Sequence, residues 1–536
     1  MNFIAIFKRR VRSRLRTCIR GYNYLKRNRA FSLVRYIYND FSSCEFSAIG
    51  VNISAHIFGA GASKAEYVVR QYLLEKLHCR PFNLCLLRAI GSRSPIAYPL
   101  PPEWRTVLLN NDIQINVVLS AILWWVFLFK QFLKGLFVLV YVLLKSLIYS
   151  VCSFSPTATY AYFYGLKYAN VSCQAANETS YNILGWYANW SGRISNIIAH
   201  TVSVPQLQTP STNIIFSPEP YLLLRNVLEL SNLFVSVVFA GIDAFWGLIF
   251  GQWWNTLLFA ESVMAHAVRI CPSERLPKDC LFHWSGNIYK PLWAYELESK
   301  GCRIVSYFYS TCDQPKLPGL AYESMQGVWG PSTWPLFLVW DKYQDELLRR
   351  DIPFAFQSII TGPIPFSNEE ALFIPSNQTC VAVFDIEFFR LSSHFAFSTL
   401  ADYFSSNPNL SSLFLNQIQQ ALADSGLIMA FKKKREEGNR SQKIYRKLLD
   451  ELSQMSNVVM IPSGVSAMQL VGQCSAVISM PFTSTALLLR EQNIPSIYYD
   501  PTGWIQRDDR AAHGIPVLIG ANELRLWIAN LLTNNS

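Results

Sequence analysis

This chain contains, at residues 475–501, the stretch Ser-Ala-Val-Ile-Ser-Met-Pro-Phe-Thr-Ser-Thr-Ala-Leu-Leu-Leu-Arg-Glu-Gln-Asn-Ile-Pro-Ser-Ile-Tyr-Tyr-Asp-Pro. The apolar run 476–480 predicts a buried strand, which Pro481 ends because proline cannot donate a hydrogen bond to a sheet. A polar loop and a helix over 486–492 follow, and 495–499 predicts a second strand. Strand, polar loop, helix and strand in this order are typical of a parallel α/β sheet.

The polar loop of that unit is a candidate phosphate site. Thr483, Ser484 and Thr485 lie where a helix begins, and the first N–H groups of a helix have no partner inside it. The positive end of the helix dipole faces the same way, and this combination binds phosphate. An ordinary helix cap in a structural turn is the alternative, because most capped helices bind no ligand.

The same alternation of strands and helices recurs along the chain. In the second half, strands are expected at 380–385, 427–431, 458–461, 476–480 and 495–499, and helices at 411–425, 440–455, 465–473, 484–492 and 521–533. In the first half, strands are expected at 51–58, 82–87, 281–284, 303–309, 337–339 and 358–361. The pattern predicts an α/β fold with two Rossmann-like domains facing a cleft.

The length of 536 residues agrees with more than one domain. We expect a basic N-terminal arm at 1–45, an N-terminal α/β domain at 46–366 with an apolar helical insertion at 115–152, a linker at 367–378 and a C-terminal domain at 379–536. The polar, proline-flanked composition of the linker indicates the hinge between the two halves.

The positive charge of the chain is concentrated at its start. The formal net charge is +11, and residues 1–36 hold eleven Lys and Arg and no acid. A basic arm beside apolar residues fits anionic lipid, whereas a nucleic-acid-binding protein more often carries its basic face on the folded body. A solvated tail is the alternative. The twelve cysteines show no zinc spacing, which is typical of thiols in a reducing cytoplasm.

Residues 117–151 form the most lipid-like stretch. Each apolar run in it is shorter than the roughly 20 residues that a membrane span needs. On a helix, Lys130, Lys134 and Lys145 fall within about 60° of one another, so they form a cationic stripe on an apolar rod. We therefore expect inserted helices that lie in the membrane surface; a span is the second interpretation and a buried core helix the third. Residues 233–260 are also apolar, and they fit either the membrane interface or a pair of helices in the protein core.

Basic residues follow a strand of the second half. Lys432, Lys434 and Arg435 cannot all be buried, so we expect them at the carboxyl edge of the sheet, where the 483–485 loop also opens. Lysines and an arginine beside a helix N-terminus suit a nucleotide phosphate. A solvated basic turn is the alternative.

Other polar residues end strands at the same edge. Asp385 could orient a ribose or cap the next segment, and Tyr499 with Asp500 could contact a base or sugar. The sequence contains no Asp-x-Asp pair, no phosphate-binding P-loop and no Gly-x-Ser-x-Gly elbow. We therefore expect no metal site.

Several of these stretches resemble bacterial surface-carbohydrate (O-antigen and capsule) biosynthesis proteins with the GT-B glycosyltransferase fold. They are Met429–Arg435, Ser479–Ala486, Pro495–Pro501, Val383–Asp385, Gly362-Pro363 and Tyr181-Asn182 with Trp186. More distantly, the chain is similar to GT-B sialyl- and Kdo-transferases, which hold a CMP-sugar with a basic His-Pro motif and a Ser-Ser/Thr motif. Ser484-Thr485 matches the second motif, and Lys432–Arg435 takes the place of the first, although the His-Pro itself is absent.

The resemblance implies a metal-independent, inverting glycosyltransferase without a further cofactor. It would move a sugar, such as a nonulosonate from a CMP-linked donor, to a growing polysaccharide or a lipid-linked glycan. Gly362 joins the donor-binding residues, and the C-terminal domain holds the nucleotide-sugar. Candidate bases in the acceptor-side domain are Glu178, His283 and Glu323.

The expected location is the cytoplasm, peripherally at the inner face of the plasma membrane. The expected partners are the nucleotide-sugar, the acceptor and an anionic membrane surface, but no nucleic acid. Two alternatives stay open, namely a GT-B sugar-nucleotide epimerase and a non-catalytic partner in polysaccharide assembly.

Overall fold

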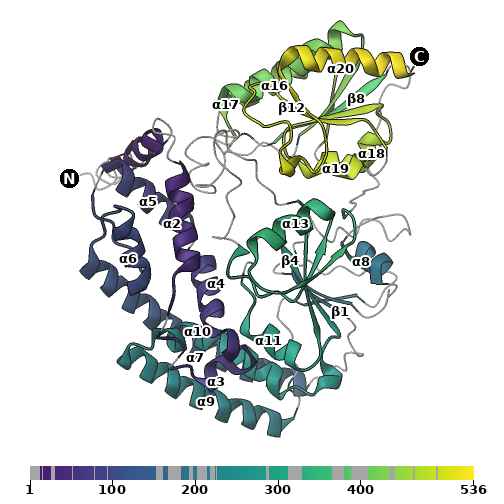
Figure 1. Cartoon of the computed structure of the whole chain (residues 1–536). Helices are drawn as coiled ribbons and strands as arrows, with labels where there is room; N and C mark the ends of the chain where they lie inside the picture. Colours follow the sequence, from purple (N-terminus) through teal and green to yellow (C-terminus); the bar gives the residue numbers. More distant parts are fainter. Residues whose placement is uncertain are drawn as a thin grey trace, which may run out of the picture.

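The architecture is described here from a computed structural model. It describes residues 13–14, 16–25, 31–46, 48–50, 52–77, 79–92, 94–151, 161–166, 183–191, 197–201, 214–217, 224, 226–284, 289–308, 310–311, 329–364, 379–386, 388, 408–433, 441–462, 465–490 and 493–535. Figure 1 shows two α/β lobes and a layer of helices packed beside one of them. We call the lobe built on the sheet of residues 161–360 the N-terminal lobe, and the lobe built on the sheet of residues 380–519 the C-terminal lobe.

The sheet of the N-terminal lobe has seven strands in the order β3-β2-β1-β4-β5-β6-β7. The strands are β1 (Ala161–Leu166), β2 (Ile197–Thr201), β3 (Ile214–Ser217), β4 (Asp279–Trp284), β5 (Arg303–Phe308), β6 (Leu336–Val339) and β7 (Gln357–Ile360). Every pairing between them is parallel. The chain leaves the neighbouring strands β1 and β4 in opposite directions, so this point is the topological switch where ligands bind in such sheets.

The C-terminal lobe repeats this plan with six parallel strands in the order β10-β9-β8-β11-β12-β13. They are β8 (Cys380–Phe384), β9 (Ile428–Lys432), β10 (Val458–Ile461), β11 (Ala476–Ser479), β12 (Ser496–Asp500) and β13 (Val517–Ile519). The five strands predicted in this half are present within a residue or two, and β13 is a sixth that the sequence did not reveal. The switch point lies between β8 and β11.

Helices cover both faces of each sheet. In the N-terminal lobe they are α8 (Ile183–Ser191), α11 (Leu292–Ser299), α13 (Lys342–Asp351) and the 3₁₀ turn η3 (Ser273–Arg275). In the C-terminal lobe they are α16 (Pro408–Asp424), α17 (Lys443–Leu452), α18 (Ala467–Val471), α19 (Ser484–Arg490), η4 (Arg510–Ala512) and α20 (Gly520–Asn535). Figure 1 shows α8 and α11 on opposite sides of the N-terminal sheet.

The described residues before β1 are mainly helical, and with α9 and α10 they form the helical layer; this corrects two sequence predictions. The helices are α2 (Phe31–Ser43), α3 (Ala55–Phe58), η1 (Gly59–Lys64), α4 (Ala65–Leu77), α5 (Arg80–Ser92), α6 (Pro102–Asn110), α7 (Val117–Val151), α9 (Val227–Phe250) and α10 (Trp253–Ile270). The strands expected at 51–58 and 82–87 are wrong: Ser54 caps α3, and α5 buries Phe82 and Leu86 one helical turn apart. Short apolar runs fit either structure until their packing is known.

The basic arm expected at 1–45 is also packed in its described part. Residues 16–25 are helical, and they bury Cys18, Tyr22 and Leu25. Helix α2 buries Val34, Ile37 and Phe41 in the same core. These apolar positions recur at helical spacing, so the arginines between them project from a folded helix rather than from a free tail.

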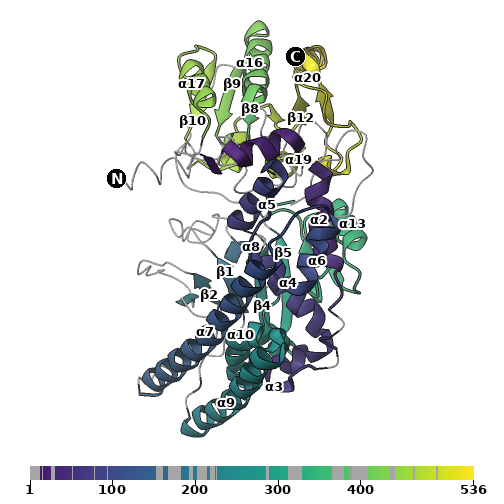
Figure 2. The same ribbon diagram turned by 90° about the vertical axis from the view of Figure 1, so that its left-hand side faces the viewer.

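Two long apolar helices lie side by side against α10, as Figure 2 shows. Val117–Ile148 of α7 and Val227–Phe250 of α9 are each long and apolar enough to cross a membrane, and only 28% of each most apolar window is buried. On α7, Val118 and Phe137 are both 71% exposed, while Lys130 and Lys134 are exposed beside them. The apolar helices expected in the N-terminal half are therefore present, and the second apolar stretch, 233–260, is divided between α9 and α10.

One acidic residue interrupts the apolar sequence of α9. The Asp243 carboxylate accepts a hydrogen bond from the Ser54 hydroxyl at 2.5 Å, and its Oδ2 lies 2.9 Å from Nδ1 of His56. Both partners belong to the short helix α3 and its cap. The charge of Asp243 thus has polar partners on the side of α9 that faces the protein.

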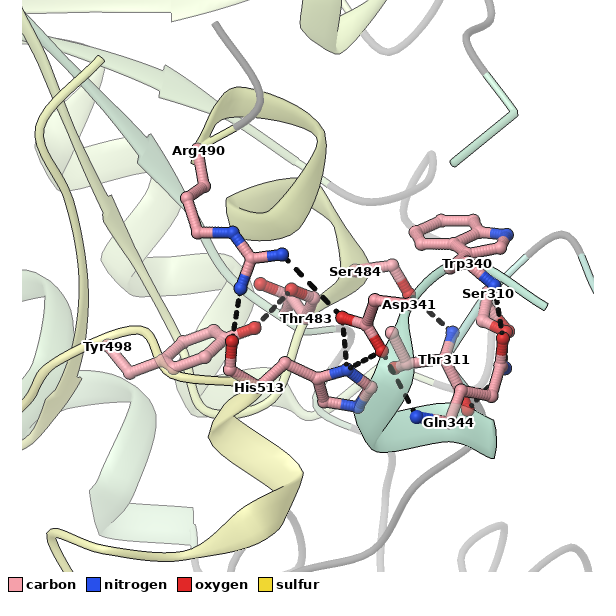
Figure 3. A network of polar contacts seen from close by, with 10 residues as sticks. All are labelled: Ser310, Thr311, Trp340, Asp341, Gln344, Thr483, Ser484, Arg490, Tyr498 and His513. Carbon is pink, nitrogen blue, oxygen red and sulfur yellow. Dashed lines mark hydrogen bonds and ion pairs between the residues drawn. The ribbon is translucent and has the colours of Figure 1, made fainter. Parts of the chain in front are cut away.

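The lobes meet through their sheet edges, as Figure 3 shows. Asp341, which follows β6, accepts hydrogen bonds from Nδ1 of His513 at 2.8 and 3.0 Å and lies 3.6 Å from the Arg490 guanidinium. Burial would raise the pKa of the Asp341 carboxyl, but the hydrogen bond and charge of His513, with Arg490, lower it below its usual value. The carboxyl edges of the two parallel sheets thus face each other, which confirms two Rossmann-like domains of the GT-B type.

The helical layer supplies a first prediction, at the crossing of residues 16–25 and α5. A Cβ on Gly91 would overlap the Thr17 carbonyl oxygen and the Gly21 amide, both of which are backbone atoms that cannot move aside. We expect Gly91→Ala to lower the free energy of unfolding by about 2–3 kcal/mol in denaturant titration. Gly472→Ala is the control, since a Cβ there meets nothing closer than 3.7 Å and should be neutral or slightly stabilising. If the two variants were equally stable, the backbones of residues 16–25 and α5 would not lie this close together.

The contact between the lobes supplies a second prediction. Asp341→Ala removes the partner of a buried histidine and should cost about 3–5 kcal/mol of unfolding free energy. Because Asp341 also caps α13, Ser466→Ala, which removes only the cap of α18, is the matched control and should cost about 1 kcal/mol. Since the pKa of Asp341 is lowered, its contribution should be complete above about pH 4 and should fall as pH drops through the lowered pKa. Equal costs for the two variants would contradict an interlobe contribution.

Candidate functional site

The candidate site lies where β11 ends, at the switch point of the C-terminal sheet. Residues Pro481, Phe482, Thr483 and Ser484 follow this strand and lead into α19. Their backbone is fixed on both sides: the Thr483 amide donates to the Met480 carbonyl at 3.1 Å, and the Thr483 carbonyl accepts from the Tyr498 hydroxyl at 2.9 Å. The loop is thus held rigidly between β11 and β12.

Two hydroxyl groups in this loop region are buried without a hydrogen bond. Thr483 is 6% exposed and Ser479, the last residue of β11, is fully buried. In the part of the chain that the structure describes, neither Thr483 Oγ1 nor Ser479 Oγ has a hydrogen-bond partner. An unpaired buried hydroxyl costs about 1–3 kcal/mol, so such groups are expected where a ligand supplies the partner.

Ser484 connects this loop to the other lobe. Its Oγ accepts a hydrogen bond from the Thr311 amide at 3.4 Å, and Thr311 follows β5 of the N-terminal lobe. Thr485 is half-buried in the first turn of α19. Since α19 has only seven residues, the buried hydroxyl groups, rather than the helix N-terminus, define the candidate site. The loop therefore lies between the lobes.

The structure describes only one of the three predicted basic residues. Lys432 is the last residue of β9 and is 9% exposed, at the same carboxyl edge and one strand beyond β8. Lys434 and Arg435 lie outside the described residues. One cation of the expected cluster is therefore on the expected edge, on a strand two places from β11.

Three other predicted donor-binding residues form hydrogen bonds within the C-terminal lobe. Asp385 is buried and accepts a hydrogen bond from the Tyr445 hydroxyl. Asp500 accepts from the amides of Thr502 and Ile505 at 2.8 and 2.7 Å, so it caps its own loop. The Tyr499 hydroxyl donates to Gln417 on α16 at 2.5 Å, and burial raises the pKa of Tyr499 to about 12.

Gly362 follows β7 with φ +74°, a backbone conformation that suits glycine in a turn. Its role in donor binding stays a prediction.

Of the three predicted bases, Glu178 and Glu323 lie outside the described residues. His283 is buried near the carboxyl end of β4, and its ring centroid lies 5.2 Å from that of Tyr307 on β5. Among the described residues, no group of three or more His, Cys, Asp or Glu side chains could hold a metal ion.

Sequence reasoning missed Ser479. It is the one hydroxyl residue in the apolar run 476–480, and a lone polar residue in a buried strand is the signal that could have revealed it. Whether such a side chain finds a partner depends on its neighbours in space, which the sequence pattern does not give.

Comparison with solved structures finds likenesses of low sequence identity, among them the following three. Trehalose-6-phosphate synthase from E. coli, bound with UDP-2-fluoro glucose, is 10% identical with a TM-score of 0.37, and the match covers 70% of this chain and 91% of that one. Glycosyltransferase SnogD from Streptomyces nogalater is 14% identical with a TM-score of 0.33, covering 70% and 95%. UDP-GlcNAc 2-epimerase from Methanocaldococcus jannaschii is 8% identical with a TM-score of 0.35, covering 70% and 91%.

No curated protein matches the sequence. A family model, described as polysaccharide biosynthesis PFTS motif protein, matches residues 240–528, which is more than half of the chain. Residues 481–484 within that match read Pro-Phe-Thr-Ser, the PFTS of the description. The chain therefore belongs to the polysaccharide biosynthesis PFTS motif family.

Proposed function

We propose that this protein is a glycosyltransferase that builds a surface polysaccharide and holds the phosphate of a nucleotide-sugar at the Pro481–Ser484 loop. The observation that carries the proposal is the pair of buried, unpaired hydroxyl groups of Thr483 and Ser479 at the switch point. Hydroxyl groups donate to phosphate oxygens, and the cation of Lys432 lies on the same edge. Membership of the family supports polysaccharide as the product.

The proposed reaction is a single displacement with inversion and without a metal. The acceptor hydroxyl oxygen attacks the anomeric carbon, and the bond from that carbon to the donor phosphate oxygen breaks. Its electron pair stays on the phosphate, where Thr483, Ser479 and Lys432 stabilise the charge. The hydroxyl proton passes to a base of the N-terminal lobe, for which His283 is the described candidate.

The donor proposed from the sequence resemblance is a nonulosonate, such as sialic acid or Kdo, linked to CMP. The acceptor proposed is lipid-linked, as in O-antigen, lipopolysaccharide or capsule synthesis, at the inner face of a bacterial plasma membrane. The exposed apolar faces of α7 and α9 and the basic N-terminus support this membrane association.

A nucleotide-sugar that binds the folded chain should raise its melting temperature by mass action. We expect one of CMP-, UDP-, GDP- or CDP-linked sugars to do so without added metal. Thr483→Val should leave the ligand-free melting temperature unchanged or slightly higher, because it removes an unpaired buried hydroxyl. It should weaken nucleotide binding about tenfold or more, since a hydrogen bond to a charged group contributes about 1.5–3 kcal/mol.

The control is Thr502→Val in the same lobe, whose hydroxyl donates to Asp500 at 2.6 Å. That variant should lose stability and keep nucleotide affinity. If no nucleotide-sugar stabilises the wild type, the transferase proposal fails; if donors bind equally well to Thr483→Val, the placement of the phosphate is wrong.

The membrane proposal has its own test. Phe137→Asp puts a charge at a side chain that is 71% exposed on α7 and should weaken binding to vesicles containing anionic lipid at least about tenfold in flotation assays. Leu526→Asp, at a side chain 66% exposed on α20 of the C-terminal lobe, is the matched control and should float like the wild type. Equal losses in both variants would contradict a specific membrane face.

A further inference from the structure

Three polar aromatic side chains gather on one face of the N-terminal sheet. His283 on β4 and Tyr307 on β5 are paired in register, and their ring centroids lie 5.2 Å apart. Trp186 on α8, which covers this face, lies with its ring centroid 5.6 Å from that of Tyr307. The cluster combines an imidazole, a phenol and an indole.

Two members of this cluster are buried and unpaired. Tyr307 is fully buried and Trp186 is 6% exposed. Within the described chain, the Tyr307 hydroxyl and the Trp186 Nε1 have no hydrogen-bond partner. Burial also raises the pKa of the Tyr307 phenol well above its usual value, so it stays protonated and can donate. Two adjacent unpaired polar groups are costly unless a ligand supplies their partners.

A neighbouring tyrosine on this face has a buried hydroxyl that is hydrogen-bonded within the protein. Tyr187, the residue after Trp186, is also fully buried, but its hydroxyl donates to the Asp279 carboxylate at 2.5 Å. Asp279 in turn binds the Arg303 guanidinium at 2.7 and 2.9 Å, at the amino ends of β4 and β5. The paired hydroxyl lies at the amino end of the sheet, whereas the unpaired Tyr307 lies toward the carboxyl end.

The carboxyl end is the one that faces the other lobe. Tyr307 is the second-last residue of β5, and the same segment reaches Thr311, whose amide donates to Ser484. His283 is likewise second-last in β4, which borders the topological switch between β1 and β4. The cluster therefore lies toward the carboxyl edge of the N-terminal sheet, which is the edge that faces the Pro481–Ser484 loop.

We infer that Tyr307 and Trp186, together with His283, form the subsite that binds the acceptor sugar. This inference rests on the proposed function. A sugar offers hydroxyl groups that accept from the indole and exchange hydrogen bonds with the phenol, and its C–H faces pack on aromatic rings. Of the three described members of the cluster, only the imidazole can carry a charge near neutral pH, so the cluster suits a neutral sugar hydroxyl rather than a phosphate. Both groups are buried in the ligand-free chain, so a sugar reaches them only when the side chains that cover them move aside.

The test is Tyr307→Phe, which removes only the hydroxyl. Nucleotide release is measured from the donor that stabilises the chain, against increasing amounts of a chloroform–methanol extract of the membranes of the source cells. We expect the half-saturating amount of extract to rise at least about tenfold, while the melting temperature and the nucleotide-induced thermal shift stay at wild-type values. Trp186→Phe should raise the half-saturating amount in the same way, with some loss of stability from its smaller ring.

Tyr187→Phe is the matched control: it should lower the melting temperature, because it breaks a buried hydrogen bond, and should leave the half-saturating amount unchanged. Wild-type kinetics in both Tyr307→Phe and Trp186→Phe, with nucleotide binding intact, would overturn the subsite alone. If no donor stabilises the wild type, or no extract stimulates release, the proposed function falls and this inference falls with it.

Discussion

Both sheets are wholly parallel, and this constraint determines where chemistry can occur. In a parallel sheet every strand ends at the same edge, and helices occupy both faces, so the loops after the strands are the only polar segments that converge. Here Thr311 and Asp341 follow β5 and β6 of one lobe, and Ser484 follows β11 of the other. Thr311 contacts Ser484, and Asp341 contacts His513 and Arg490 of the same lobe as Ser484, so the two carboxyl edges share one interlobe region. A substrate bound there would contact both lobes.

The hydrogen-bond pattern distinguishes supporting residues from candidate ligand groups in that region. Asp500 and Asp385 are carboxylates at strand ends, as a ligand site would need, yet each is bonded to its own lobe. Thr483 and Ser479 are less conspicuous in sequence but lack partners in the described chain. A rigid loop whose hydroxyl groups are left unpaired is pre-organised, because binding a phosphate then requires no protein hydrogen bond to break.

Much of the C-terminal lobe could be predicted from sequence, because each strand there is a short apolar run bounded by proline, glycine or polar residues. In runs such as 458–461 and 476–480, the short length and the proline that follows favour a strand. The N-terminal helical layer could not be predicted in the same way: Phe82 to Leu87 is apolar except for Asn83, and the packing of α5 against residues 16–25 decides that it is a helix. Sequence placed the Thr483–Ser484 loop at the sheet edge. It could not assign partners, so Tyr499 was expected at a ligand although its hydroxyl binds Gln417.

The carboxylate of Asp243 limits how α9 can meet a lipid bilayer. A helix of 24 residues is about 36 Å long, close to the hydrocarbon thickness, so a crossing orientation would bring Asp243 deep into the apolar layer. Ser54 and the half-exposed ring of His56 would be drawn in with it, at a desolvation cost of several kcal/mol. With α9 parallel to the bilayer plane, the same three polar side chains stay at headgroup depth. They would thus limit how far α9 can sink into a bilayer, because each of them loses its hydration below that depth.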